Sequence, residues 1–138
     1  MVDFQRKVTY IAAMEIITRT DAPTFDAGGT AVVGYAAPSR GAAEVSMWQI
    51  ELAPGSTSPR HQMDREEIFL GLAGHAIAEI DGSQHPLGAG DCLILPAGTD
   101  FTLHVPGQQP FRALACTPAG AQATMASDGA TFLPPWAE

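Results

Sequence analysis

Glycine and proline recur every few residues from Ala22 onward, and they limit how long any helix or strand can be. The chain of 138 residues contains 14 Gly and 11 Pro. Because glycine weakens and proline interrupts both helices and central strands, only short elements fit between them. The intervening segments are rich in β-formers and lie at residues 30–35, 45–52, 68–72, 76–80, 92–95, 101–105 and 111–116. Short strands at this spacing predict an all-β sandwich or barrel.

A hairpin signal and the lack of helical periodicity support the same fold class. Asp81-Gly82 follows one of the predicted strands, and both central residues of a tight type I′ hairpin turn need positive φ. No segment after residue 20 keeps a helical period, whereas residues 3–17 fit either a short helix or an added edge strand. We therefore predict one folded domain over residues 21–138, preceded by an extension or added edge strand over residues 1–20.

The charge balance excludes several classes of partner. Fifteen Asp and Glu against seven Lys and Arg give a net charge of −8, and the basic residues are scattered. Nucleic acids and anionic membranes attract proteins through clustered positive charge, so neither is an expected partner. Residues 8–17 are too short to span a bilayer and contain Glu15, and no convincing cleavage site follows them. We expect a cytoplasmic protein in which Cys92 and Cys116 are buried free thiols.

Two spaced motifs carry a resemblance to a known family. The first runs Gly55-x5-His61-x-Met63-x3-Glu67-x6-Gly74, and the second runs Gly90-x5-Pro96-x-Gly98-x2-Phe101. With the fifteen residues between them, they resemble the two motifs of the cupin superfamily, and the resemblance covers roughly residues 44–117. It implies a cupin-type antiparallel double-sheet β-barrel, or jelly roll. The glycines and Pro96 fit that fold because they stand where strands begin or end.

The same resemblance implies a metal site that has lost ligands. Family members bind a divalent metal through two His and a Glu of the first motif and a His of the second; by position these are His61, Met63, Glu67 and Phe101. Thioether is a poor ligand for iron, manganese, nickel or zinc, and phenylalanine is no ligand. We therefore expect no cofactor, with a divalent transition metal held by His61 and Glu67 as the alternative. His104 can join them only if its strand is bulged, since strand side chains alternate between faces.

His61 and Glu67 are also the candidate catalytic residues. An ionisable pair directed into an apolar interior is costly unless it is used or paired. One interpretation is a mutually satisfied relic of the ancestral site; the other is an acid/base or substrate-anchoring pair in which Glu67 orients the His61 imidazole. The surrounding pocket is predicted to be apolar. Its expected lining residues are Met63, Phe69, Gly71, Phe101, Leu103 and Val105.

These features favour a small-molecule-binding enzyme that acts, without redox metal chemistry, on a small apolar or aromatic compound. An isomerase, cyclase, dehydratase or lyase fits, with His61 as general base or acid. The alternatives are a non-catalytic ligand-binding or sensory barrel, and a metal-dependent dioxygenase-like protein with non-standard ligands. A homodimer is expected, because residues 8–17 are apolar enough to add a strand to a neighbouring sheet and cover its edge.

Overall fold

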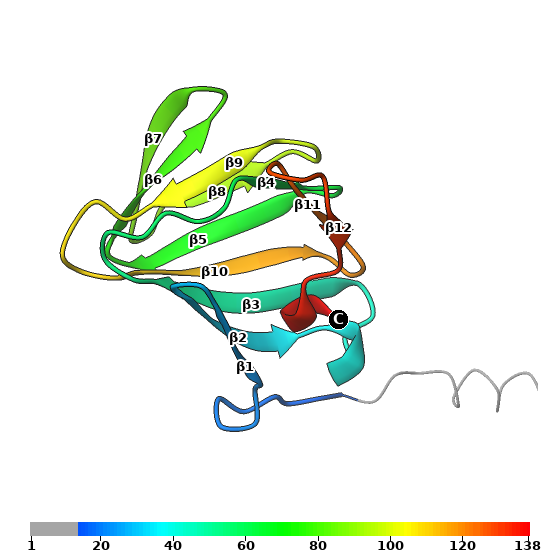
Figure 1. Cartoon of the computed structure of the whole chain (residues 1–138). Helices are drawn as coiled ribbons and strands as arrows, with labels where there is room; N and C mark the ends of the chain where they lie inside the picture. The colour runs from blue at the N-terminus through cyan, green and yellow to red at the C-terminus, as the bar shows by residue number, and fades with distance from the viewer. Residues whose placement is uncertain (1–13) are drawn as a thin grey trace, which may run out of the picture.

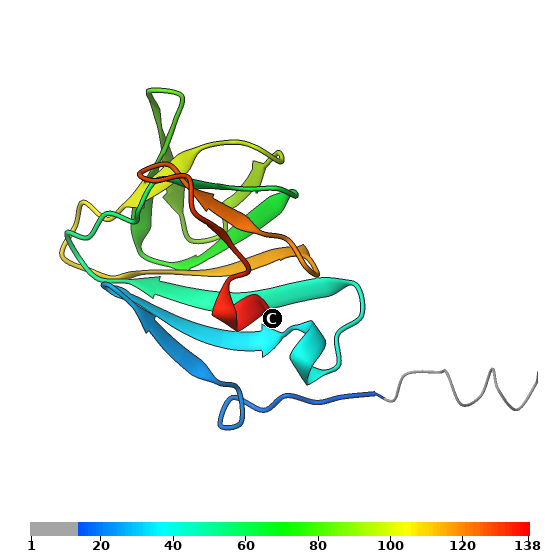
Figure 2. The same ribbon diagram turned by 45° about the vertical axis from the view of Figure 1, so that its right-hand side comes forward.

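The structure is a computed structural model that describes residues 14–138. Two antiparallel six-stranded sheets face each other across the core (Figures 1 and 2). The first sheet has the strand order β1-β2-β3-β10-β5-β8, and the second has the order β12-β11-β4-β9-β6-β7. Two short 3₁₀ helices, η1 (Pro38–Arg40) and η2 (Pro135–Ala137), are the only helical elements of the described residues. The predicted all-β, double-sheet jelly-roll fold is confirmed.

The chain passes repeatedly from one sheet to the other. The first sheet consists of β1 (Thr24–Ala27), β2 (Thr30–Ala36), β3 (Val45–Leu52), β5 (Glu67–Ala73), β8 (Cys92–Leu95) and β10 (Phe111–Pro118). The second consists of β4 (His61–Met63), β6 (His75–Ile80), β7 (Ser83–Gly88), β9 (Phe101–His104), β11 (Ala123–Met125) and β12 (Thr131–Phe132). Only three residues separate β4 from β5, yet these two strands lie in opposite sheets.

Alternating side chains build the core between the sheets. β10 pairs with β3 along its whole length, from Phe111↔Leu52 to Pro118↔Val45. Every second residue of each strand is buried, which is the period that a sheet with one buried face requires. The inward apolar positions of these two strands are Trp48, Ile50, Leu52, Phe111, Ala113 and Ala115.

The strands agree with the sequence pattern where it is strongest. All seven predicted segments coincide with strands, and their ends differ by at most two residues. The hairpin is also present: β6 and β7 meet at Ile80↔Ser83, and Asp81 and Gly82 take positive φ values of 51° and 76°. Of the strands outside the seven segments, β7 has six residues and is implied only by the hairpin signal, whereas β1, β4, β11 and β12 have at most four residues each.

Residues 131–138 cross from the second sheet to the first. They include β12 and then η2, which packs against β2 and β3 (Figure 2). The Trp136 ring lies against Phe25 and Trp48, with ring centroids 6.1 and 6.5 Å away. Arg40 Nη2 donates to the Trp136 carbonyl oxygen at 2.8 Å. Gly34 leaves room for this hydrogen bond, because a Cβ there would lie 2.9 Å from the same Arg40 nitrogen.

Three further expectations concern the ends and the surface of the chain. Of the predicted extension over residues 1–20, residues 1–13 lie outside the described residues, and residues 14–20 form no strand. Within residues 14–138, no helix has the length and apolar character that crossing a membrane requires. The prediction of buried thiols is wrong. Cys92 is exposed and Cys116 is half-buried, because both alternate with inward-facing neighbours on the outer face of the first sheet.

Candidate functional site

A cavity of about 550 Å³ lies between the two sheets and is partly open to solvent. Both sheets contribute to its wall, together with η2. Most of the side chains that line it are apolar or aromatic. The polar exceptions are Asp26, Thr30, Ser58, His61 and Glu67. An apolar cavity of this size with a few polar groups is suited to a small organic molecule.

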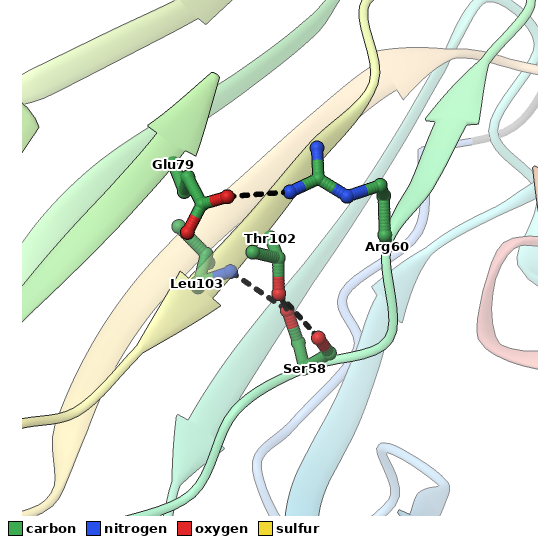
Figure 3. Close-up of polar contacts among 5 residues, drawn as sticks. All are labelled: Ser58, Arg60, Glu79, Thr102 and Leu103. Atoms are coloured by element: carbon green, nitrogen blue, oxygen red, sulfur yellow. Dashed lines mark hydrogen bonds and ion pairs between the residues drawn. The ribbon is translucent and has the colours of Figure 1, made fainter. Parts of the chain in front are cut away.

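Hydrogen bonds fix the chain immediately before β4 against the second sheet (Figure 3). Ser58 Oγ accepts a hydrogen bond from the Leu103 N–H at 2.8 Å, and the Thr102 hydroxyl donates to the Ser58 carbonyl oxygen. Arg60 Nη2 forms an ion pair with Glu79 Oε1 at 2.7 Å. That pair is partly exposed, so it contributes little free energy by itself but restricts where β4 begins.

His61, the first residue of β4, is held by its backbone and by its ring. It pairs with Phe101 of β9, and the two rings lie 4.6 Å apart between centroids. Its Nδ1 lies 2.9 Å from the Pro59 carbonyl oxygen. Because a carbonyl can only accept, Nδ1 carries the proton of the neutral ring and Nε2 keeps a free lone pair. The imidazole is therefore set up to accept a proton through Nε2.

Glu67, the first residue of β5, is the most deeply buried ionisable group that lines the cavity. Its side chain is 3% exposed, and Oε1 has no hydrogen-bond partner among residues 14–138. Burial away from water raises the pKa of Glu67 to about 8, because the charged form loses its solvation. The carboxyl group is therefore mostly protonated at neutral pH, and it can donate a hydrogen bond or a proton to a molecule in the cavity.

The predicted direct pairing of His61 with Glu67 is absent. In the described part of the chain, no hydrogen bond or ion pair joins the two side chains. β4 belongs to the second sheet and β5 to the first, so the two residues line the cavity from different sheets. They line one cavity as separate groups, one with a free nitrogen lone pair and one with an acidic proton.

The other predicted pocket residues divide into two groups. Met63, Phe69, Phe101 and Leu103 line the cavity. Gly71 and Val105 do not line it, although both lie at inward-facing positions, as expected. Val105 is fully buried in the core. The turn between β7 and β8 packs against Gly71, whose N–H donates to the Asp91 carbonyl oxygen at 2.9 Å.

Replacing Gly71 with alanine should destabilise the protein by roughly 2 kcal/mol, because the new Cβ overlaps backbone atoms that cannot move freely. That Cβ would collide with the Gly88 carbonyl group. Chemical denaturation measures the change, and Gly107→Ala is the matched control, since its Cβ would meet nothing closer than 4.0 Å. Equal stabilities of the two variants would contradict the close approach at Gly71.

His104 faces away from the cavity. Its Nδ1 lies 2.8 Å from Thr57 Oγ1 on the outer side of the second sheet. β9 pairs with β6 in continuous register from Phe101↔Ile80 to His104↔Ile77. No bulge therefore turns the His104 side chain to the other face of the sheet. His104 therefore secures the segment before β4 and does not extend the donor set of the cavity.

The donors in the cavity do not fit the divalent-metal site that the sequence resemblance implies. Met63 and Phe101 hold two of the four ligand positions, and the Phe101 ring packs on the His61 ring. Among residues 14–138, no three His, Cys, Asp or Glu side chains gather closely enough to hold an ion. One imidazole and one protonated carboxyl group are fewer donors than a stable protein site uses.

Several cavity residues were not among the predicted site residues. Phe25, Trp48, Met125, Phe132 and Trp136 all line the cavity. Trp48 could have been found, because it alternates with exposed residues in a strongly patterned strand. The others lie on β1, β11, β12 and η2, which are too short to show a period. These aromatic and thioether side chains make the cavity wall well suited to flat, unsaturated molecules.

Comparison with known proteins connects this cavity to one family. A family model described as "Cupin domain" matches residues 48–117, which is half of the chain. No curated protein sequence matches significantly.

Solved structures share the fold at low sequence identity. The polyketide cyclase RemF from Streptomyces resistomycificus superimposes with a TM-score of 0.74 at 19% identity, over 89% of each chain. A sugar phosphate isomerase from a cupin superfamily, from Silicibacter pomeroyi, gives 0.61 at 20% identity over 79% of each chain. Salicylate 1,2-dioxygenase from Pseudoaminobacter salicylatoxidans gives 0.66 at 16% identity over 77% of this chain, which spans only 31% of the dioxygenase. At these identities the similarity shows the fold alone.

Proposed function

The chain belongs to the cupin family, and from this premise we propose that it is a metal-independent enzyme acting on a small apolar or aromatic compound. The reaction is of the isomerase, cyclase, dehydratase or lyase type, in which protons move and no electron is exchanged with a metal. The observation that carries the proposal is the protonated Glu67 carboxyl group in an apolar cavity that His61 also lines.

The two groups have complementary roles in such chemistry. Glu67 in its neutral form donates a hydrogen bond, and then a proton, to an oxygen of the substrate. His61 Nε2 accepts a proton from a carbon or oxygen of the same molecule, and Pro59 stabilises the resulting imidazolium through its carbonyl group. One proton enters the substrate and one leaves it, so an isomerisation balances without a co-reactant. In a dehydration, the proton from Glu67 departs with the leaving hydroxyl group as water.

The apolar wall supports this assignment in two ways. It favours an aromatic or otherwise hydrophobic substrate, and it keeps Glu67 protonated near neutral pH, where a solvated carboxyl group would be ionised. The solved structures of this fold include a polyketide cyclase and a sugar phosphate isomerase, which are activities of the proposed type. They also include a dioxygenase, but Met63 and Phe101 stand at two of the ligand positions that the family resemblance assigns.

Binding is tested first, because the proposal requires Glu67 to contact the ligand. A panel of small aromatic ketones and phenols is screened by thermal shift, and each hit is titrated by calorimetry. We expect Glu67→Gln to weaken binding of ketone hits by about tenfold, because an amide N–H is a weaker hydrogen-bond donor than the O–H of a neutral carboxyl group. The control is Glu66→Gln, which changes the adjacent exposed carboxylate and should leave affinity unchanged. Equal affinities of the wild type, Glu67→Gln and Glu66→Gln for the same ketone would show that Glu67 does not contact the ligand.

Proton transfer is tested next, because it separates an enzyme from a non-catalytic binding protein. A bound ketone hit is incubated in D₂O, and exchange of its α-hydrogens is followed by NMR. Exchange should be faster with wild-type protein than with buffer, and His61→Leu should abolish the acceleration while the ketone still binds. Tight binding without any acceleration in the wild type would instead assign the cavity to a ligand-binding or sensory role.

A further inference from the structure

Four buried polar side-chain atoms have no hydrogen-bond partner among residues 14–138. They are Glu67 Oε1, Asp100 Oδ1, Thr117 Oγ1 and Trp136 Nε1. Of these four residues, Glu67 and Trp136 line the cavity. Buried polar groups in native proteins nearly always have a partner, and a buried indole N–H usually finds one. Under the proposed function a substrate oxygen becomes the partner of Glu67, which leaves the Trp136 N–H without one.

The chain around Trp136 is held in place, so the unpaired N–H does not come from a loose chain end. Arg40 Nη2 donates to the Trp136 carbonyl oxygen at 2.8 Å, and Arg40 Nε donates to the Tyr35 carbonyl oxygen at 3.0 Å. Ser46 Oγ donates to the next carbonyl oxygen along the chain, that of Ala137, at 3.3 Å. The indole ring itself packs against two other aromatic rings. The protein therefore fixes the direction of the N–H before a ligand binds.

The polar residues nearest in the fold do not accept a hydrogen bond from this indole. Asp26 and Thr30 also line the cavity, and Asp26 follows Phe25, whose ring contacts Trp136. Even so, Nε1 has no partner in the described part of the chain. An indole nitrogen can only donate. The partner that it lacks is therefore an acceptor, supplied by a molecule inside the cavity.

Trp136 and Glu67 lie at different ends of the cavity. The strand register places Trp48 of β3 beside Ala115 of β10, and Ala115 beside Phe69 of β5. Glu67 is two residues further along β5. Two strand spacings of about 4.8 Å and two residues of about 3.4 Å each separate the Cα atoms of Trp48 and Glu67 by roughly 12 Å. Since η2 contacts β2 and β3, Trp136 belongs to the end of the cavity away from β5 (Figure 1).

We propose that the Trp136 N–H is a second substrate anchor, which selects a flat aromatic compound with an oxygen acceptor at each end. The inference rests on the proposed function, because it takes Glu67 as the anchor of the first oxygen. A ketone oxygen meets Glu67, and an ether, ester or phenol oxygen at the far end of the ring system meets the indole N–H. The apolar wall between the two anchors takes the aromatic body. Because both anchors donate, a compound that lacks either acceptor is discriminated against.

Two matched ketones test the second anchor by calorimetry. One is a tetralone with a methoxy group on its aromatic ring, para to the carbonyl group. The other carries an ethyl group at the same place, which has a similar shape but no acceptor. The wild type should bind the methoxy compound at least about tenfold more tightly. Equal affinities would overturn the proposal, and so would failure of both ketones to bind. Equal affinities are also what a buried water molecule on the N–H would give.

Two variants show whether the preference depends on Trp136, because a methoxy group also makes the ketone oxygen a better acceptor. Trp136→Phe keeps an aromatic ring but has no N–H, and it should abolish the preference. The space that it opens affects both ketones alike, so the ratio of their affinities isolates the hydrogen bond. Trp48→Phe is the matched control, since it opens space in the same wall and should keep the ratio. A preference that survives in Trp136→Phe, or that is lost in Trp48→Phe instead, would overturn the proposal.

The indole protons of the wild type give a second measurement, which does not require any variant to fold. The chain has two tryptophans, so an isotope-labelled sample gives two indole N–H signals, which through-bond NMR experiments assign. The Trp136 proton should move downfield when the methoxy ketone binds, because a hydrogen bond deshields it, and should move much less with the ethyl ketone. Shifts of equal size with the two ketones would contradict the second anchor.

The outcomes separate this inference from the proposed function. If Trp136→Phe loses the methoxy preference while Glu67→Gln binds both ketones as the wild type does, the Trp136 anchor stands and the proposed acid fails. If Glu67→Gln weakens both ketones while the preference is independent of Trp136, the acid stands and the second anchor is overturned.

Discussion

The free energy of unfolding is expected to fall as the pH rises from about 5 to 8, by up to about 1.4 kcal/mol per pH unit, because of Glu67 alone. The pKa of this carboxyl group is about 8 in the folded protein and near the ordinary 4.5 in the unfolded chain. Between these two values the unfolded chain releases a proton that the folded protein retains. Rising pH therefore favours the unfolded state throughout this window, and the full difference is on the order of 5 kcal/mol.

The measurement is a set of urea denaturation curves across this pH range for the wild type and Glu67→Gln. A glutamine has similar shape but no proton to lose, so the difference in stability between the two proteins should change with pH in the window of Glu67. Below about pH 4.5 the difference should be constant, because the carboxyl group is then protonated in both folded and unfolded states. Parallel pH profiles would show that Glu67 is solvated and ionised in the folded protein. Glu67 could then not act as the proposed acid.

Building a metal site should be possible with two substitutions, and the expected effect is a large gain in affinity. Met63→His together with Phe101→His gives, with His61 and Glu67, the full ligand set that the family resemblance implies. Three imidazoles and a carboxylate suit zinc, nickel, manganese or iron. Met63, Phe101, His61 and Glu67 all line the same cavity, so the new donors face the existing ones.

We expect the double variant to retain about one equivalent of zinc or nickel after dialysis, measured by elemental analysis, with the wild type retaining far less. Metal should raise the melting temperature of the double variant only, because it binds the folded protein. Met63→Leu with Phe101→Leu is the matched control, since it alters the same positions without adding donors. Stoichiometric metal in the dialysed wild type that depends on His61 would refute the metal-independent mechanism.

The sequence predicts the fold well because the signals that define it are local. The hairpin at Asp81-Gly82 and the glycines of both motifs act through backbone conformation, and five of the motif and turn glycines take positive φ: Gly55, Gly74, Gly82, Gly90 and Gly98. Strands such as β3 carry a clear period of two over eight residues. Such features do not depend on distant parts of the chain, so a single sequence is enough to recognise them.

The site was harder to predict because it depends on how distant segments meet. The alternation of side chains along a strand correctly places Glu67, Phe69 and Gly71 on the inward face of β5. It does not show that the β7–β8 turn fills the space beside Gly71. Spacing brings His61 and Glu67 to one cavity, yet it does not show that their strands lie in opposite sheets. The wall formed by β12 and η2 escapes prediction because Phe132 and Trp136 belong to elements of two or three residues.

The placement of the two tryptophans has an optical consequence. The chain has only Trp48 and Trp136, and both line the cavity. The intrinsic indole emission of the protein therefore originates entirely from the cavity wall. Any molecule that enters displaces water from beside these rings or quenches them directly. The protein thus contains its own spectroscopic reporter of occupancy, so its natural ligand can be sought without a label and before its reaction has been identified.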